Sequence, residues 1–193
     1  MRMALAGIVA VATISGCSFV HAADIAAGKE KAQICAGCHG ENGISQTESI
    51  PSLAGQPDQF IQWQLVYFRS GARKSEQMQP IAAQIDNEDI RNLGAYFSSL
   101  TPPKAPPDDN PNLSKKGAQA AVGRRCASCH TDTFAGTKAV ARIAAQREDY
   151  LVKALYDFKS GERSGGGVAA MADVAYPLSE EEIEALAHYL AHL

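Results

Sequence analysis

The chain has 193 residues, of which 46% are hydrophobic and 20% are charged, a composition typical of globular proteins. Its formal net charge is −3, and basic residues do not cluster beyond pairs such as Arg124-Arg125. Nucleic-acid binding is therefore not expected, because it requires a basic face. The length suits one medium domain or two small ones.

The N-terminal segment predicts export from the cytoplasm. One positive charge precedes an apolar run, Met3–Ile14, that is too short to span a bilayer. We expect residues 1–23 to act as an export signal that is cleaved before Ala23. Alternatively, the run ends in a lipobox-like Ile-Ser-Gly-Cys, in which Cys17 becomes lipidated. Both outcomes, and the less favoured uncleaved anchor, predict a periplasmic protein that is soluble or lipid-anchored at a membrane.

The first half, residues 24–101, is predicted to be helical. A short helix over 25–34 precedes the first cysteine of the half, and apolar residues at helical spacing predict a second helix over 57–70. The run beginning at Asp86 supplies a capping residue and an acidic first turn for a third helix. That helix is expected to bury Ile90, Leu93 and Phe97. Runs of alternating polarity are lacking, so almost no sheet is expected.

A proline-rich stretch, residues 102–113, follows the first half. Proline has no amide hydrogen and favours extended geometry, so this stretch is predicted to be a semi-rigid linker. The alternative is a surface loop within one domain.

The second half, residues 114–193, repeats the first at an offset of about 90 residues. Phe68–Arg73 aligns with Phe158–Arg163, and helices are again predicted over 147–160 and from Ser179 to the C-terminus. Two homologous helical domains explain the repeat and disfavour the loop interpretation of the linker.

Each half carries one Cys-x-x-Cys-His motif, and this motif predicts covalent attachment of haem c. The two thiols add to the haem vinyl groups, and the adjacent imidazole ligates the iron. A single Cys-x-x-Cys is also compatible with a redox disulfide or half of a zinc site, but two copies ending in histidine at matched positions favour haem. The predicted thioether and proximal residues are Cys35, Cys38 and His39 in the first half, and Cys126, Cys129 and His130 in the second.

Methionine is the expected sixth iron ligand. Met78 and Met171 are the only methionines beyond the export segment, and each stands just ahead of the last helix of its half. His188 and His192 are the competing candidates for the second haem, although they are more readily interpreted as partly exposed surface residues. Paired histidine and methionine ligands raise the haem potential and leave no vacant iron position, so an electron carrier is expected rather than an enzyme.

These motifs resemble those of class I cytochrome c domains. The resemblance rests on Cys-x-x-Cys-His-Gly-x-x-Gly at 35–43, Pro-Ser-Leu-Ala-Gly-Gln at 51–56, Tyr-Phe-Arg-Ser-Gly at 67–71, and Met78. The tandem arrangement resembles the dihaem cytochromes of the c-four family over essentially the whole mature chain. That family implies an all-α fold of two tandem domains related by a pseudo-twofold axis and carrying two covalently bound haem c groups. It also implies that a proline carbonyl, here of Pro51, accepts a hydrogen bond from the proximal imidazole.

The resemblance further implies a periplasmic shuttle with redox-protein partners. The expected donor is a quinol-oxidising cytochrome bc complex, and the expected acceptor is a terminal haem-copper oxidase. The main alternative is a cytochrome subunit of a dehydrogenase complex such as flavocytochrome c sulfide dehydrogenase. A dihaem enzyme, such as a peroxidase or thiosulfate dehydrogenase, is disfavoured by the paired methionines. Contact with a membrane is expected only through a lipid on Cys17.

The second half departs from the pattern. Thr131 follows its motif where glycine is usual, and Ala141 replaces Pro51. We expect the Ala141 carbonyl to serve the second imidazole and the two haem potentials to differ. Residues 24–101 carry a formal charge of −3 and residues 114–193 carry none, which we interpret as solvated helix surface or, alternatively, as two ends that dock to different partners.

Overall fold

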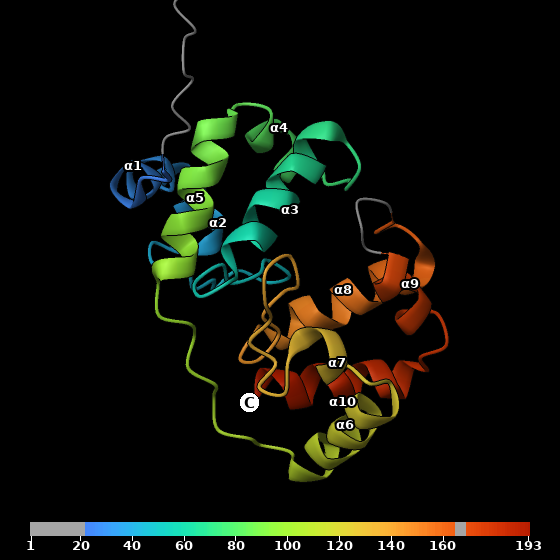
Figure 1. Cartoon of the computed structure of the whole chain (residues 1–193). Coiled ribbons are helices and arrows are strands. Elements are labelled where there is room, and N and C mark those ends of the chain that lie inside the picture. The colour runs from blue at the N-terminus through green and yellow to red at the C-terminus, as the bar shows by residue number, and fades with distance from the viewer. Residues whose placement is uncertain (1–21, 165–168) are drawn as a thin grey trace, which may run out of the picture.

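The computed structural model describes residues 22–164 and 169–193, so the export segment with Cys17 lies outside the described residues. The described residues form ten helices in two lobes, α1–α5 and α6–α10 (Figure 1). Apart from an isolated bridge between Thr137 and Val140, these residues contain no β structure. The expected all-α fold is therefore confirmed.

The first lobe contains two of its predicted helices where they were expected, α3 (Asp58–Ser70) and α5 (Asn87–Ser99). The N-terminus of α5 is closed by a capping box in which the Asp86 carboxylate accepts the Asp89 amide and Asp89 reciprocates. Its expected core residues are all buried: Ile90, Leu93 and Phe97. A further short helix, α4 (Met78–Ala82), was not predicted.

The prediction of one helix over 25–34 is wrong, because two helices occupy this region. α1 (Ile25–Lys31) ends at the buried Ala32, and α2 (Gln33–His39) begins directly after it. The Ala32 amide donates to the Gly28 carbonyl, and the turn places both Ala32 and Cys35 in the core of the lobe. The first cysteine thus lies within a helix rather than after one.

The second lobe repeats this arrangement. Its helices are α6 (Pro111–Gly123), α7 (Ala127–His130), α8 (Glu148–Ser160), α9 (Ala169–Ala175) and α10 (Glu180–Ala191). A second capping box, between Ser179 and Glu182, begins α10 where the sequence predicted a helix start. The predicted helix over 147–160 corresponds to α8.

The first and last helices of each lobe cross at very short range. A Cβ added to Gly28 of α1 would overlap the Asn92 carbonyl of α5, and a Cβ added to Gly117 of α6 would overlap the Ala185 carbonyl of α10. Only glycine permits such backbone proximity. Gly28 and Gly117 occupy equivalent positions of the repeat, so both lobes are built around the same helix crossing.

The linker runs outside the two lobes as an extended segment between α5 and α6 (Figure 1). The Asn110 side chain accepts the Leu113 amide at 3.2 Å, and Pro111 occupies the first turn of α6. Residues 111–113 are thus helical, and the extended part of the linker is shorter than expected. Among the described helices, none has the length and apolar character needed to cross a membrane.

Candidate functional site

Each Cys-x-x-Cys-His motif ends in a buried histidine that is held by a backbone carbonyl. His39 Nδ1 lies 2.8 Å from the Pro51 oxygen, and His130 Nδ1 lies 2.8 Å from the Ala141 oxygen, as expected from the resemblance. Because a carbonyl oxygen only accepts, Nδ1 carries the hydrogen in both rings. The lone pair is therefore on Nε2, the arrangement found in metal-ligating histidines.

Burial keeps both imidazoles neutral. It lowers the pKa of His39 and of His130, and the hydrogen bonds to the Pro51 and Ala141 carbonyls only partly oppose this effect. A neutral imidazole is the form that binds a metal. Both histidines are thus prepared as ligands by their surroundings.

The four cysteines of the two motifs form no disulfide with one another, and each pair has one inner and one outer member. Cys35 is buried, and burial together with the neighbouring Cys38 raises the pKa of its thiol to about 11. Burial also raises the pKa of the Cys126 thiol. Cys38 and Cys129 are exposed. This arrangement suits attachment of one edge of a prosthetic group at the mouth of a cavity.

The first lobe contains such a cavity, with a volume of about 870 Å³. Cys35, Cys38, His39 and Met78 all line it, so the structure brings together the four residues predicted for the first haem. Most of the remaining wall is apolar and includes Leu53, Ile61, Leu65, Phe68, Leu93 and Phe97. A thioether, an imidazole and two thiols around an apolar cavity are the donor set that haem c requires.

Cationic groups in the wall of the cavity fit the haem carboxylates. Arg73, Lys74, Lys153 and Arg163 line the cavity, the last two from the second lobe, together with the acidic residues Glu48, Asp157 and Glu162. Arg163 is buried, and its Nε lacks a hydrogen-bond partner among the described residues. An unsatisfied buried guanidinium nitrogen is costly, and a propionate oxygen is a suitable acceptor for it.

In the second lobe, Cys126 and Met171 pack against one core cluster, which includes Phe158, Leu186 and Leu190. His130 is buried at the end of α7. Met171 lies in α9, whereas Met78 is the first residue of α4, so both methionines belong to short helices that the sequence did not predict.

The loop after the second motif keeps the backbone path of the first without its glycines. Thr131 adopts φ 70° and ψ 162°, close to the values of Gly40 at φ 81° and ψ 149°. Phe134 has φ 53° where Gly43 has φ 68°. The Phe134 carbonyl accepts the backbone amides of Ile143 and Ala144, as the Gly43 carbonyl accepts those of Leu53 and Ala54. The ligand loop is therefore preserved at the cost of local strain on residues with side chains.

The two lobes are joined by a reciprocal pair of glutamines. Gln146 accepts the Ser52 amide at 2.8 Å and donates to the Ser52 carbonyl at 2.9 Å. Gln56 accepts the Arg142 amide at 3.0 Å and donates to the Arg142 carbonyl at 2.9 Å. Both glutamines are buried. Ser52 directly follows Pro51, and Arg142 directly follows Ala141, so each glutamine holds the loop that orients the motif histidine of the other lobe.

A second set of contacts between the lobes surrounds Gln64. Its Oε1 accepts from Arg73 at 2.7 Å and from Arg163 at 3.0 Å, and Arg73 also donates to the Tyr150 hydroxyl at 3.3 Å. Burial opposes ionisation of Tyr150, but the two guanidiniums prevail and lower its pKa to about 8. Gln64, Arg73, Tyr150 and Arg163 all line the first cavity, so the second lobe supplies part of the wall of the first candidate haem site.

The expectation that His188 is a partly exposed surface residue is wrong. Its side chain is 5% exposed, and its ring lies between the carboxylates of Glu148 and of the linker residue Asp108. His192 is partly exposed, as expected, and stacks on His188 with ring centroids 4.2 Å apart. His188 is buried because it contacts Asp108 of the linker, and residue spacing along one helix does not show such a long-range contact.

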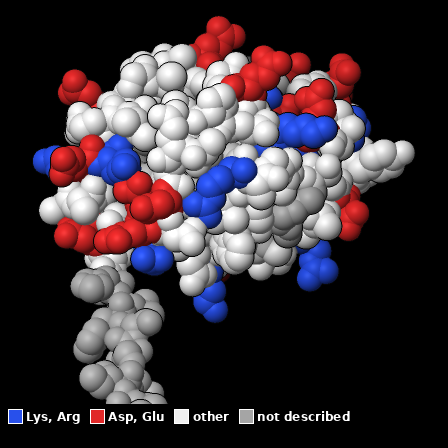
Figure 2. Space-filling view, turned by 90° about the horizontal axis from the view of Figure 1, so that it is seen from above, with Lys and Arg blue, Asp and Glu red and all other residues white. Residues whose placement is uncertain are grey.

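On the face shown in Figure 2, acidic and basic side chains are interspersed around a broad uncharged area and do not separate into large single-sign areas. Elsewhere, the exposed Cys38 and the half-exposed Ile34 both line the first cavity. An exposed apolar side chain beside a candidate redox site suits brief docking to a protein partner.

Comparison with known proteins identifies the family. The family model described as Cytochrome c matches twice, over residues 25–101 and 114–193. Cytochrome c4 of Pseudomonas aeruginosa is 30% identical, with 94% of each chain covered. Cytochrome c4 of Thiocapsa roseopersicina is 33% identical, over 88% of this chain and 93% of the relative. A thiosulfate dehydrogenase electron acceptor of Thiomonas intermedia is 29% identical, over 95% and 89%.

Comparison with solved structures identifies the same family. The crystal structure of reduced cytochrome c4 from Pseudomonas stutzeri superposes with a TM-score of 0.81 at 30% identity, over 89% of this chain and all of that one. Thiosulfate dehydrogenase TsdBA of Marichromatium purpuratum gives a TM-score of 0.75 at 29% identity, over 87% of this chain and 40% of that one. This chain therefore belongs to the cytochrome c family as a dihaem electron carrier of the cytochrome c4 type, with two tandem domains and two covalently bound haem c groups.

Proposed function

We propose that this protein shuttles electrons through two haems with paired histidine and methionine ligands. The thioethers would form at Cys35, Cys38, Cys126 and Cys129, and the axial ligands would be His39 with Met78 and His130 with Met171. When bound, each haem supplies a one-electron iron couple. The chain orients each imidazole through Pro51 or Ala141 and surrounds the group with apolar side chains. The first cavity, lined by both cysteines, the histidine and the methionine of its lobe, is the observation that carries this proposal.

A redox titration of a matched pair of variants tests the ligand assignment. Met78→His and Met171→His each replace a thioether by an imidazole, so each is expected to lower one haem potential. Each should also remove about half of the near-infrared band of methionine-ligated ferric haem. If Met171→His leaves both the band and the potentials unchanged, the sixth ligand of the second haem is a different residue.

The contact of the second lobe with the first cavity supports electron exchange within the molecule. The wall of the first cavity includes Tyr150, Lys153 and Arg163 of the second lobe, so the first candidate haem site borders that lobe. An electron could therefore enter at one haem and leave at the other. We expect a single-turnover experiment to show reduction of one haem followed by equilibration with its neighbour faster than exchange between molecules.

Respiratory electron transfer in the periplasm is the proposed setting. The expected donor is a cytochrome bc complex, and the expected acceptor is a terminal haem-copper oxidase. Relatives named as thiosulfate dehydrogenase electron acceptors favour a second candidate, in which a dehydrogenase reduces the protein. Stopped-flow reduction by each purified donor distinguishes the two candidate functions. Only the physiological donor should reduce the protein in a fast second-order reaction whose rate constant falls as the salt concentration rises.

We also propose that residues 1–23 act as an export signal, which is either cleaved or processed to a lipid-modified Cys17. Mass spectrometry of the mature protein would find Ala23 near its N-terminus after ordinary cleavage, or a lipid-modified Cys17 after lipoprotein processing. Either result supports export, whereas an unprocessed N-terminus in the cytoplasmic fraction contradicts it.

A further inference from the structure

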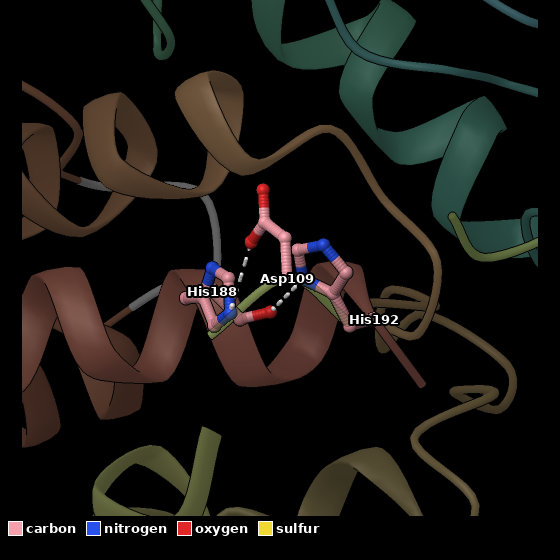
Figure 3. A group of neighbouring side chains, drawn as sticks. All are labelled: Asp109, His188 and His192. Atoms are coloured by element: carbon pink, nitrogen blue, oxygen red, sulfur yellow. Dashed lines mark hydrogen bonds and ion pairs between the residues drawn. The ribbon is translucent and has the colours of Figure 1, made fainter. Parts of the chain in front are cut away.

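Two histidines and two linker carboxylates meet where the linker passes the last helix. His188 and His192 lie one turn apart at the end of α10, and Asp109 of the linker faces both rings (Figure 3). The candidate ligand atoms of Asp109, His188 and His192 all lie within 4.8 Å of one another. Asp108 lies beside them, with an oxygen 3.1 Å from His188 Nε2.

Both imidazoles are held through Nδ1. His188 Nδ1 lies 3.2 Å from the Glu148 carboxylate, and His192 Nδ1 lies 2.8 Å from the His188 backbone oxygen. Metal-ligating histidines characteristically use one ring nitrogen for such an outer partner, a carboxylate or a backbone carbonyl, and the other for the metal. Here that leaves the two Nε2 atoms as the ligand atoms. His188 Nε2 is already 3.1 Å from Asp108 and 3.8 Å from Asp109.

We propose that this cluster binds a divalent transition-metal ion of the Zn²⁺ type. The ligands are His188 Nε2, His192 Nε2 and a carboxylate oxygen of Asp109, with Glu148 as the outer partner of His188. Two imidazole nitrogens disfavour Ca²⁺ and Mg²⁺, which take oxygen ligands. A Zn²⁺ ion about 2.0–2.2 Å from each ligand requires the ligand atoms to approach slightly. Rotation of the exposed Asp109 side chain provides that movement.

The ion would fasten the linker to the second lobe. Asp108 and Asp109 belong to the extended segment between the lobes, whereas the histidines belong to α10. Without a metal, burial lowers the pKa of His188, but Asp108 and Glu148 outweigh this effect and raise it, which favours an imidazolium between the two carboxylates. Metal binding replaces the Nε2 proton and ties the linker by coordination in place of this ion pair.

Calorimetric titration of Zn²⁺ into the chelator-treated protein with both haems attached tests the proposal. One ion is expected to bind per molecule. His192→Gln and Asp109→Asn each remove a proposed ligand at a partly or fully exposed position, and each is expected to weaken binding at least about tenfold. Glu148→Ala removes only the outer partner and is expected to weaken binding by about 10–100-fold. Glu181→Gln changes an exposed carboxylate elsewhere on α10 and should leave the affinity unchanged.

X-ray absorption at the zinc edge supplies a readout that is independent of the haem irons. Two imidazole ligands are expected, and the spectrum of His192→Gln should have lost one of them. Tryptic cleavage after the exposed Lys104 should become slower when Zn²⁺ is added, because the linker is then held at both ends. Absence of saturable binding, or equal affinity in His192→Gln and the unsubstituted protein, overturns the proposal and leaves the cluster as an ion pair only.

Discussion

Removal of a glutamine in one lobe should shift the potential of the haem in the other lobe. In Gln146→Ala, the buried amide and carbonyl of Ser52 both lose their partner. An unsatisfied buried polar group costs about 1–3 kcal/mol, so the loss of both partners should weaken the contact between the lobes by roughly 2–6 kcal/mol. The neighbouring Pro51 carbonyl holds His39 at 2.8 Å, and loosening this loop changes the field and orientation of the imidazole.

The assay is a spectroelectrochemical titration of both haems, combined with thermal unfolding. Gln146→Ala is expected to shift mainly the first-lobe haem, and Gln56→Ala mainly the second-lobe haem. Gln84→Ala is the matched control, because that side chain is exposed and bonds only to Pro80 within its own lobe. If each variant shifts the haem of its own lobe, or if neither differs from Gln84→Ala, the glutamines do not couple the lobes to the proximal histidines.

Three further predictions concern stability. Gly28→Ala should destabilise the first lobe by several kcal/mol, since the added methyl overlaps the Asn92 carbonyl; a melting temperature equal to that of the unsubstituted protein would contradict the helix crossing. Thr131→Gly should stabilise the second lobe by about 1 kcal/mol in chemical denaturation, because it relieves a backbone conformation suited to glycine. Gly40→Ala should conversely destabilise the first lobe. A loss of stability in Thr131→Gly would refute the backbone strain at this position. The pKa of Tyr150 in the folded protein is about 8, below the ordinary tyrosine pKa of about 10. Its ionisation therefore contributes stability that is complete above pH 10 and is lost as the pH falls through 8. Relative to Tyr150→Phe, the unsubstituted protein should therefore gain up to about 3 kcal/mol between pH 8 and 10, and parallel pH profiles of the two proteins would exclude this ionisation.

Local signals in the sequence predicted much of the fold. The capping residues Asp86 and Ser179 correctly marked the starts of α5 and α10, because a cap acts within one helical turn. The repeat predicted two lobes, and the family comparisons confirm the tandem domains. The break at Ala32 was missed because its cause is the packing of Cys35 into the core, which no spacing within the segment reveals.

The features that the sequence did not predict depend on contacts between distant segments of the chain. Gln56 and Gln146 align in the repeat, but the sequence does not show that each reaches the other lobe. Likewise, the burial of His188 depends on Asp108, which is 80 residues away. His39 and Met78 line one cavity, as expected for two ligands of one haem. The redox titration tests the predicted iron ligands of both lobes.

The reciprocal interface, together with the extended linker, makes this architecture suited to domain swapping. Each lobe offers the partner surface that the other requires, and the linker passes outside both lobes rather than between them (Figure 1). The same glutamine contacts can therefore close between the first lobe of one molecule and the second lobe of another. Concentrated protein should contain dimers that dissociate slowly on dilution, and a metal that holds Asp109 to α10 would favour the monomer by restricting the linker.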